Sequence, residues 1–190
     1  MLIFGASTLG EMAIAVAHRA GVVIEGIYDD VTKEKTFCGA PILGGLPALL
    51  ASGKDRRVFV AVGDNAGREK VTASLRGSGL KLGSLIDPRA YTESDTLVGE
   101  GSLLMAGCYL GVRVAVGAGT LVFPGVSITH HNQVGHFNFF APNASVGGFT
   151  TIGDRCKIGM NAVIMPYGEL ASDSVVAPGA VSGGGSTNGR

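Results

Sequence analysis

Residues 98–176 read VGEGSLLMAGCYLGVRVAVGAGTLVFPGVSITHHNQVGHFNFFAPNASVGGFTTIGDRCKIGMNAVIMPYGELASDSVV, and every sixth residue of this stretch is apolar. A period of six fits neither the 3.6-residue period of a helix nor the two-residue period of a half-buried strand. It is typical of a hexapeptide β-helix, in which each short strand stacks on the equivalent strand of the next coil. The apolar positions are Val98, Leu104, Leu110, Val116, Val122, Ile128, Val134, Phe140, Val146, Ile152, Ile158, Ile164, Leu170 and Val176.

The residues between these apolar positions match the corners of such a coil. The fourth residue after the apolar one is usually small, which predicts a second row of side chains that points inward. The second residue after the apolar one is proline in four of the repeats, and the third is mostly Gly, Asn or Asp. These residue types suit tight turns, where φ is fixed by a proline ring or must be positive. The sequence therefore predicts a parallel β-helix over residues 86–181.

Residues 1–85 lack the six-residue period and alternate between strand and helix patterns. Strands are expected at residues 2–4, 22–28, 57–62 and 81–86, a loop at 39–45, and helices from Gly10 to about Ala20, over 46–51 and from 66 to about Ser78. The strand–helix–strand order implies a parallel sheet with right-handed crossovers. We therefore expect an α/β domain over residues 1–85, the β-helix over 86–181, and a flexible Gly/Ser-rich tail over 182–190.

Two features of the α/β domain suggest a ligand site. The turn Gly5-Ala6-Ser7-Thr8-Leu9-Gly10 resembles the phosphate loop of a Rossmann-like domain, in which amides at a helix start face an anion. The pair Asp29-Asp30 follows about 20 residues later, where a ribose or base could be held. Structural explanations are also open, because Ser7 could simply cap the helix and the acidic pair could be a solvated turn.

Composition excludes several classes of partner. Fifteen basic and fifteen acidic residues cancel, which argues against nucleic acid or an anionic membrane surface. The apolar N-terminal segment lacks the basic start of a signal peptide, and no stretch reaches the roughly 18 apolar residues of a membrane span. Cys108 and Cys156 fall on the inward phase of the coil, so we expect these two residues and Cys38 to be free thiols. The expected location is cytoplasmic, without membrane insertion.

Three of the four histidines, His130, His131 and His136, lie within seven residues of one another, at corner positions that should point outward. Such a cluster can be a general base, a metal site or part of a subunit interface. The neighbouring aromatic residues, which we expect to point outward beside the histidines, favour a subunit interface; they are Phe137, Phe139, Phe140 and Phe149. A metal site needs three converging ligands, which these histidines would supply only if subunits shared them, so no metal is expected.

The combination of these motifs resembles a known family. The motifs are GAS-x-x-G at residues 5–10, DD at 29–30, VGDN-x-x-R at 62–68, the His-His pair at 130–131 and APNASVGG at 141–148. They resemble the family of sialic-acid O-acetyltransferases and nucleotide-sugar N-acetyltransferases. The resemblance implies an N-terminal Rossmann-like domain followed by a left-handed parallel β-helix of hexapeptide repeats.

The resemblance also implies a mechanism and a set of site residues. It implies a homotrimer with active sites at the subunit interfaces, acetyl-CoA as co-substrate and a nucleotide-linked sugar bound by the N-terminal domain. The general base of the family matches His130; the next position, which is often acidic, is His131 here, and we count both as catalytic candidates. The family's nucleotide contacts match Ser7, Thr8, Leu9, Asp29, Asp30 and Gly63. Its acetyl-CoA contacts match Phe139, Met160 and Pro178.

The expected function is transfer of acetyl from acetyl-CoA to an amino group of a nucleotide-linked amino sugar. An imidazole, which ordinarily titrates near pH 6.5, about the operating pH, can take the proton of the attacking amine. Inward-facing cysteines argue against an acetyl-cysteine intermediate. The alternatives are O-acetylation of a sugar hydroxyl as in the sialic-acid enzymes, a metal-dependent β-helix of the carbonic-anhydrase kind, and a non-catalytic assembly module.

Overall fold

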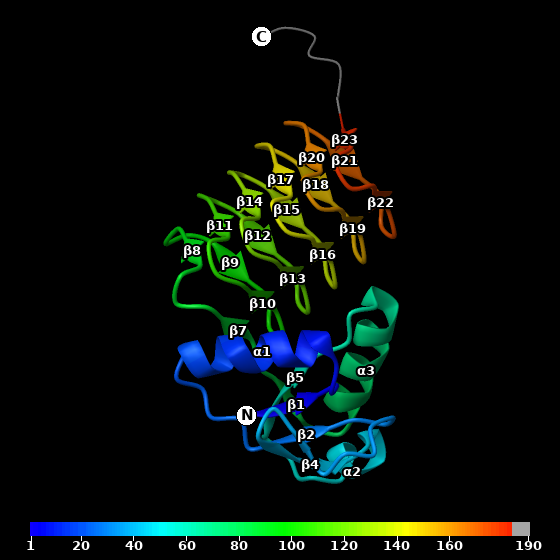
Figure 1. Cartoon of the computed structure of the whole chain (residues 1–190). Helices are drawn as coiled ribbons and strands as arrows, with labels where there is room; N and C mark the ends of the chain where they lie inside the picture. Colours follow the sequence, from blue (N-terminus) through cyan, green and yellow to red (C-terminus); the bar gives the residue numbers. More distant parts are fainter. Residues whose placement is uncertain (184–190) are drawn as a thin grey trace, which may run out of the picture. The chain divides into compact units, whose positions relative to one another are not determined.

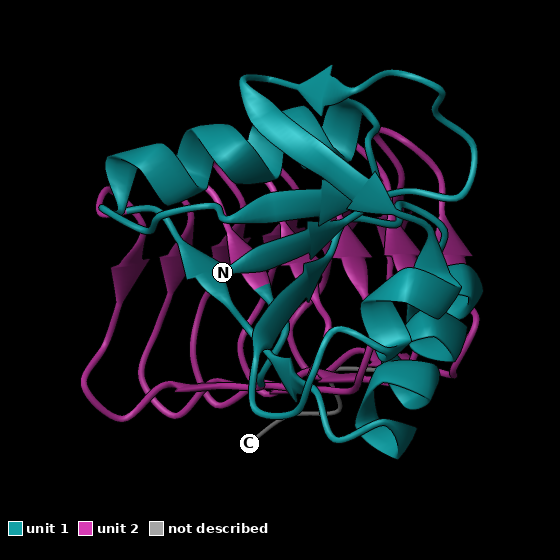
Figure 2. Cartoon of the chain, turned by 90° about the horizontal axis from the view of Figure 1, so that it is seen from below, with its two compact units in different colours: residues 1–87, 100–102 teal, residues 88–99, 103–190 magenta. Residues whose placement is uncertain are grey.

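The computed structural model describes residues 1–183, which divide into two compact units. Unit 1 comprises Met1–Asp87 with Glu100–Ser102, and unit 2 comprises Pro88–Gly99 with the chain from Leu103 onward (Figure 2). The domain boundaries expected at residues 85 and 181 stay predictions. From residue 184 on, the expected tail lies outside the described residues. No helix among residues 1–183 is long and apolar enough to cross a membrane.

Unit 1 is built on a parallel sheet with the strand order β4-β2-β1-β5-β6. Its strands are β1 (Leu2–Phe4), β2 (Gly26–Tyr28), β4 (Ala40–Gly44), β5 (Arg57–Val60) and β6 (Lys81–Leu82), with β3 (Thr36–Phe37) antiparallel to β4 at the edge and β7 (Leu85–Ile86) further along the chain. Its helices are α1 (Thr8–Arg19), α2 (Leu46–Leu50) and α3 (Asn65–Gly77) (Figure 1). The central strands are buried along their whole length, as parallel strands covered by helices require.

The expected elements of unit 1 need several corrections. Strand β3 was not expected, and the strand expected over 57–62 ends at Val60. The strand expected over 22–28 is limited to Gly26–Tyr28. The loop expected over 39–45 is wrong, because Ala40–Gly44 forms β4 and pairs with β2 in parallel. This strand forms because it pairs with β2, where Ile42 lies opposite Ile27. Glycines flank its short apolar run, so the local pattern predicted a loop. The strand expected over 81–86 is two strands, because residues 83 and 84 interrupt it.

Unit 2 is a parallel β-helix of two-residue strands (Figure 1). One face carries β8 (Tyr91–Thr92), β11 (Tyr109–Leu110), β14 (Ser127–Ile128), β17 (Ser145–Val146), β20 (Val163–Ile164) and β23 (Val181–Ser182). A second face carries β9 (Leu97–Val98), β12 (Ala115–Val116), β15 (Gln133–Val134), β18 (Thr151–Ile152) and β21 (Glu169–Leu170). A third carries β10 (Leu103–Leu104), β13 (Leu121–Val122), β16 (Phe139–Phe140), β19 (Lys157–Ile158) and β22 (Val175–Val176). These short parallel strands fit the expected left-handed β-helix.

The interior of the coil is filled by the two phases that the sequence indicated. From β9 to β22 the second residue of the strand points inward, and the fourth residue after it forms the other inward row, which includes the buried Cys108 and Cys156. Phe140 is fully buried in this core and Phe137 is 5% exposed, so the expectation that they point outward is wrong. Phe140 occupies the inward apolar phase of its hexad, which decides its direction.

The third position after the apolar residue has a positive φ at every corner from Gly101 to Gly179, as expected for Gly, Asn and Asp. Several corners nevertheless place a bulky side chain in this left-handed conformation. They are Arg113, His131, Phe137, Phe149, Arg155 and Tyr167. A non-glycine residue with positive φ is uncommon and costs free energy, so these corners are held by their packing against neighbouring coils.

Candidate functional site

A cavity of about 300 Å³ opens at the carboxyl ends of β1, β2 and β5 in unit 1. The chain order of the sheet reverses between β1 and β5, and such a switch point is where open α/β sheets bind their ligands. The residues that line the cavity are Phe4, Gly5, Ser7, Asp29, Asp30, Val31, Ala61, Val62 and Gly63. Four of the six residues expected to contact a nucleotide, Ser7, Asp29, Asp30 and Gly63, therefore line one cavity.

The start of α1 borders this cavity. Ser7 is the N-cap residue, but its side chain makes no capping bond and its Oγ donates instead to the Ala61 carbonyl at 3.3 Å. The first helical bond runs from Glu11 N to Ser7 O, so the amides of Thr8 and Leu9 have no acceptor within the helix. The Leu9 side chain is only 8% exposed, so this residue can offer a ligand little besides its backbone. The helix start thus presents amides suited to an anion.

Asp29 and Asp30 accept hydrogen bonds from the backbone of the loops around the cavity. The alternative explanation of this acidic pair as a solvated turn did not predict these bonds. Asp29 accepts from Ala6 N at 2.8 Å through one oxygen, and from Val31 N and Thr32 N through the other. Burial opposes the charged form, but these three amides outweigh it, so the pKa of Asp29 lies below its ordinary value. Asp30 Oδ1 accepts from Leu46 N at 2.6 Å, at the start of α2. Both carboxylates therefore order backbone on the rim of the cavity.

We expect Asp29→Asn to destabilise unit 1 by about 1–3 kcal/mol at pH 7, because hydrogen bonds to a charged acceptor become neutral ones. The folded pKa of Asp29 is depressed, so its contribution is full above the unfolded value of about 4 and is lost as pH falls through the folded pKa. The stability difference between the wild type and the variant should therefore shrink in urea titrations below about pH 4. Asp55→Asn, which removes an exposed partner of Lys81, is the control. A difference that stays constant down to pH 2 would contradict the role of the Asp29 charge.

Arg68 shapes the other wall of the cavity. Its guanidinium is fully buried and donates to the Val62 carbonyl at 2.9 Å, to the Gly63 carbonyl at 3.3 Å and to Asn65 Oδ1 at 2.8 Å. Burial lowers the pKa of Arg68 to about 10, against the opposing charge of Asp64, so the group remains charged at neutral pH. The sequence motif included Arg68 but assigned it no role. Its signal was a lone arginine on the face of α3 that also carries the buried Thr72 and Leu75.

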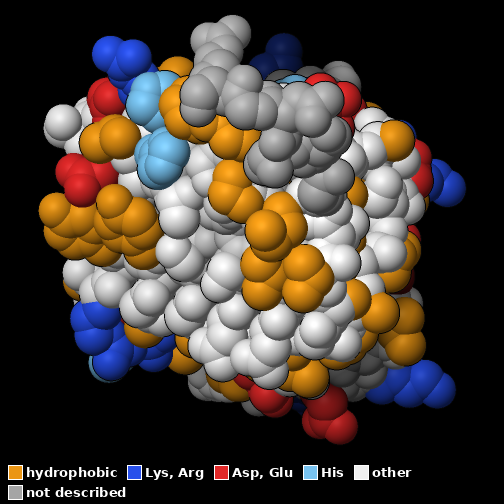
Figure 3. Space-filling model, turned by 90° about the horizontal axis from the view of Figure 1, so that it is seen from above, with side chains coloured by type: hydrophobic (Ala, Val, Ile, Leu, Met, Phe, Trp, Pro, Cys, Tyr) orange, Lys and Arg blue, Asp and Glu red, His pale blue; other side chains and the backbone are white. Residues whose placement is uncertain are grey.

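The histidine pair lies at a corner of unit 2, directly after β14. His130 is exposed, and its Nδ1 lies 3.3 Å from Nδ1 of His131. The His130 imidazole occupies the space that a Cβ at Gly148 would take. Gly148 is the one glycine among the residues that stand two positions after the hexad apolar residues from Val98 to Val176, a signal that the sequence analysis missed. Histidine side chains reach the surface beside apolar ones on the face drawn in Figure 3.

Aromatic rings hold this corner from the following coils. Phe149 stacks on His131 with ring centroids 4.7 Å apart, and Tyr167 stacks on Phe149 at 5.3 Å with the rings 3° from parallel. The edge of His130 meets Phe149 at 5.3 Å. His131, Phe149 and Tyr167 all have positive φ at the same corner of successive coils, so their side chains form a continuous stack.

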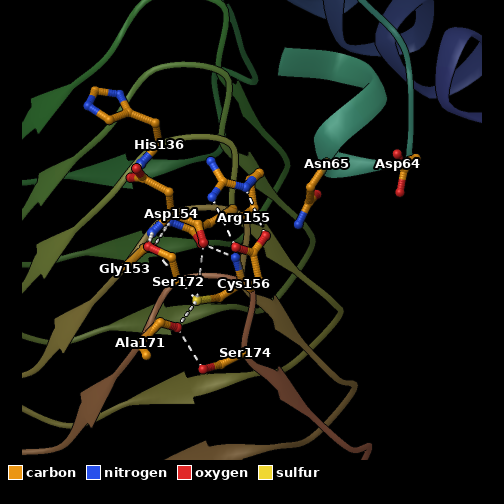
Figure 4. Close-up of polar contacts among 12 residues, drawn as sticks. Asp64, Asn65, His136, Gly153, Asp154, Arg155, Cys156, Ala171, Ser172 and Ser174 are labelled. Carbon is orange, nitrogen blue, oxygen red and sulfur yellow. Dashed lines mark hydrogen bonds and ion pairs between the residues drawn. The ribbon is translucent and has the colours of Figure 1, made fainter. Parts of the chain in front are cut away.

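His136 belongs to a different network, at another corner (Figure 4). The ring Nδ1 of His136 accepts from Ala118 N at 3.0 Å, and the backbone N–H of His136 donates to Asp154 Oδ1 at 2.6 Å. Asp154 N in turn donates to Ser172 Oγ at 2.9 Å. Each side chain thus caps the backbone of the preceding coil, which gives His136 a structural role.

The candidates for acetyl-CoA contact lie away from His130 within one chain. Phe139 is half-buried on the face formed by β13, β16 and β19, where it meets Phe123 at 4.9 Å. Met160 and Pro178 lie one coil apart at the corner that follows this face, and Met160 is 51% exposed. His130 lies at the next corner, after β14. Among residues 1–183 there is no group of three His, Cys, Asp or Glu side chains that could hold a metal ion.

Comparison with known proteins covers both units. Residues 1–75 match the PglD N-terminal domain family. The chain is 24% identical over 168 residues to the GDP-perosamine N-acetyltransferase of Escherichia coli O157:H7, which covers 85% of this chain and 76% of that protein. A GDP-perosamine N-acetyltransferase from Caulobacter crescentus is 26% identical, with a TM-score of 0.89 over 95% of this chain and 86% of that one. It was solved in complex with CoA and GDP-perosamine, as a variant in which one histidine is replaced by alanine.

The acetyltransferase domain of PglB from Neisseria gonorrhoeae FA1090, in complex with acetyl coenzyme A, is also 26% identical, with a TM-score of 0.86 over 94% of this chain and 87% of that one. The chain is thus similar to nucleotide-sugar N-acetyltransferases in sequence and in fold over most of its length. The resemblance read from the sequence motifs is thereby confirmed. This similarity directs attention to the two places described above, the cavity of unit 1 and the histidine corner of unit 2.

Proposed function

We propose that this chain transfers the acetyl group of acetyl-CoA to the amino group of a nucleotide-linked amino sugar, with His130 as general base. The observation that carries the proposal is the state of the His130 imidazole. Its Nδ1 is paired with His131, the residue is exposed, and no group among residues 1–183 pairs with its Nε2, so this nitrogen is available as a base. This imidazole lies on a fold shared over 95% of the chain with a structure that holds CoA and GDP-perosamine.

The cavity of unit 1 is the proposed site of the nucleotide in a Rossmann-like domain. The free amides at the start of α1 suit a phosphate group, and the exposed Ser7 and Gly63 leave the opening accessible. Asp29 is occupied by three amides, so it orders the loop and contacts a ligand little. Asp30 uses one carboxylate oxygen for Leu46 N, and the other has no partner within the described part of the chain, so it can accept from a ribose hydroxyl.

The chemistry needs no nucleophile from the protein. The sugar amine attacks the thioester carbonyl, and its proton passes to His130 as the N–C bond forms. Collapse of the tetrahedral intermediate breaks the C–S bond, and the proton ends on the thiolate of CoA. Cys156 is fully buried and its thiol donates to the Ala171 carbonyl at 3.2 Å. Burial raises the pKa of Cys156, which disfavours the thiolate that an acetyl-cysteine route would need.

We also propose a homotrimer as the active form. Phe139, Met160 and Pro178 lie on a face and a corner of the β-helix other than the corner of His130, so one chain does not gather all four. A second copy would supply the acetyl-CoA contacts to the His130 of the first. A molar mass in solution of one chain, together with full activity, would contradict this arrangement.

The proposed reaction is tested by measuring release of free thiol from acetyl-CoA, with a panel of GDP- and UDP-linked 4-amino sugars as acceptors. We expect release with at least one acceptor, and a product whose mass increases by one acetyl group on nitrogen. Free sialic acid is included in the panel as the competing hydroxyl acceptor. Thiol release with that acceptor alone would replace N-acetylation by O-acetylation, and no binding of acetyl-CoA would contradict the transferase function altogether.

A further inference from the structure

We infer that His131 is a positioning residue that accepts the Nδ1 proton of His130 and so keeps Nε2 of His130 free to act as the base. This inference rests on the proposed function and specifies how its base is prepared. It changes the role of His131 from a catalytic candidate to a group that acts through His130.

The 3.3 Å contact between the two Nδ1 atoms restricts their protonation. Two N–H groups that face each other repel, and so do two lone pairs, so the pair holds one hydrogen between the atoms. If His131 donated it, His130 would carry its own proton on Nε2 and could not accept another. If His130 donates, its Nε2 has a free lone pair. Only the second arrangement is competent for proton abstraction.

The surroundings of His131 hold its ring in place for this role. Its backbone has a φ of 56°, and its N–H donates to the Val112 carbonyl at 2.9 Å on the preceding coil. Phe149 stacks on the ring from the following coil at 4.7 Å, and Tyr167 supports Phe149 in turn. With its backbone bonded to one coil and its ring stacked on the next, the side chain cannot turn to another rotamer without losing the stacking contact.

The position of His130 is fixed to match. Its carbonyl accepts from Phe149 N at 3.0 Å, and its ring lies in the space left by the missing side chain of Gly148. Neither imidazole has a carboxylate partner among residues 1–183. The acceptor for the Nδ1 proton of His130 is therefore the neutral ring of His131, and this proton stays in place when Nε2 takes a second one during transfer.

Two substitutions separate the acceptor atom from the ring that carries it. His131→Phe keeps a ring for stacking on Phe149 but removes the acceptor, and this chain already tolerates phenylalanine with positive φ at residues 137 and 149. His131→Asn removes the ring but returns an acceptor oxygen near the position of Nδ1, and asparagine adopts positive φ readily. Asp173→Phe places the same side chain at a positive-φ corner of another row, below His136, and serves as the control.

We expect His131→Phe to lower kcat by about 10- to 100-fold, the range for a misdirected catalytic group, with the KM of both substrates within about twofold. His131→Asn should restore kcat to within about threefold of the wild type. The 15N chemical shifts of His130 should report an unprotonated Nε2 in the wild type and a shift toward the Nε2–H tautomer in His131→Phe. Asp173→Phe should retain the wild-type kcat.

Wild-type kcat in His131→Phe would overturn the inference, and so would an equal loss in His131→Phe and His131→Asn, because the acceptor would then not matter. Full activity of a His130→Ala variant is a different failure, since it would remove the general base itself and the proposed function with it. An inactive His130→Ala together with a fully active His131→Phe would overturn the inference about His131 alone.

Discussion

His130→Ala should lower the turnover number by about two to four orders of magnitude, the usual contribution of a positioned general base. The loss corresponds to roughly 3–5.5 kcal/mol of transition-state stabilisation. An amine that is protonated in the tetrahedral intermediate has to release its proton before the thiolate leaves, and the proposed acceptor of that proton is His130. The measurement is the initial rate of thiol release from acetyl-CoA at saturating acceptor.

The chain supplies a matched control in His136, a second outward-facing histidine one hexad further on. Its Nδ1 already accepts from Ala118 N, so His136→Ala should cost some stability but keep most of the turnover. Affinity for CoA, measured by calorimetry, should be close to wild type in both variants. Equal activity of His130→Ala and the wild type would refute the assignment, and a larger loss in His136→Ala would transfer the role to that residue.

Arg68→Met should lower the free energy of unfolding by about 3–5 kcal/mol, as is typical when one member of a buried charged network is removed. The guanidinium is fully buried and donates to Val62 O, Gly63 O and Asn65 Oδ1, so its loss leaves these acceptors, and above all the buried Asn65, without their donor. Methionine fills much of the volume, so the effect reports the polar contacts more than a void. The expected fall in Tm is about 2–4 °C per kcal/mol.

The rim of the cavity should respond as well, because Val62 and Gly63 form part of its lining. At a temperature where Arg68→Met is folded, we expect a higher KM for the nucleotide sugar with little change in the KM for acetyl-CoA. Arg76→Met is the control on the same helix; its ion pair with Glu100 is half-exposed on both sides, so its loss should change stability by less than about 1 kcal/mol. Equal stability of the two variants would show that the buried hydrogen bonds of Arg68 contribute little.

Much of the unit 2 fold could be read from the sequence because a hexad position faces the same direction on every coil. Both inward rows, including Phe140 and Cys156, follow from that period, and so do the corners with positive φ, such as the one at Asn143. The cavity of unit 1 was also foreseen in part, since the Gly5–Gly10 turn and the Asp29-Asp30 pair both lie at strand ends. Local order along the chain carries this information, because strand ends and turns depend on neighbours in sequence.

The roles of individual side chains depended on contacts between coils and between strands. His130 and His136 occupy the same hexad position, yet one has its Nδ1 beside His131 and the other accepts a backbone amide. The two differ in the residues that lie one coil, or 18 positions, away: His136 contacts Ala118 and Asp154, whereas His130 lies against Gly148. A local sequence pattern does not report such neighbours. Strand β4 and the buried Arg68 were missed for the same reason. The period of the sequence determined the scaffold, and the tertiary structure decided which side chains it leaves free for chemistry, because hydrogen-bond partners are set by neighbours in space.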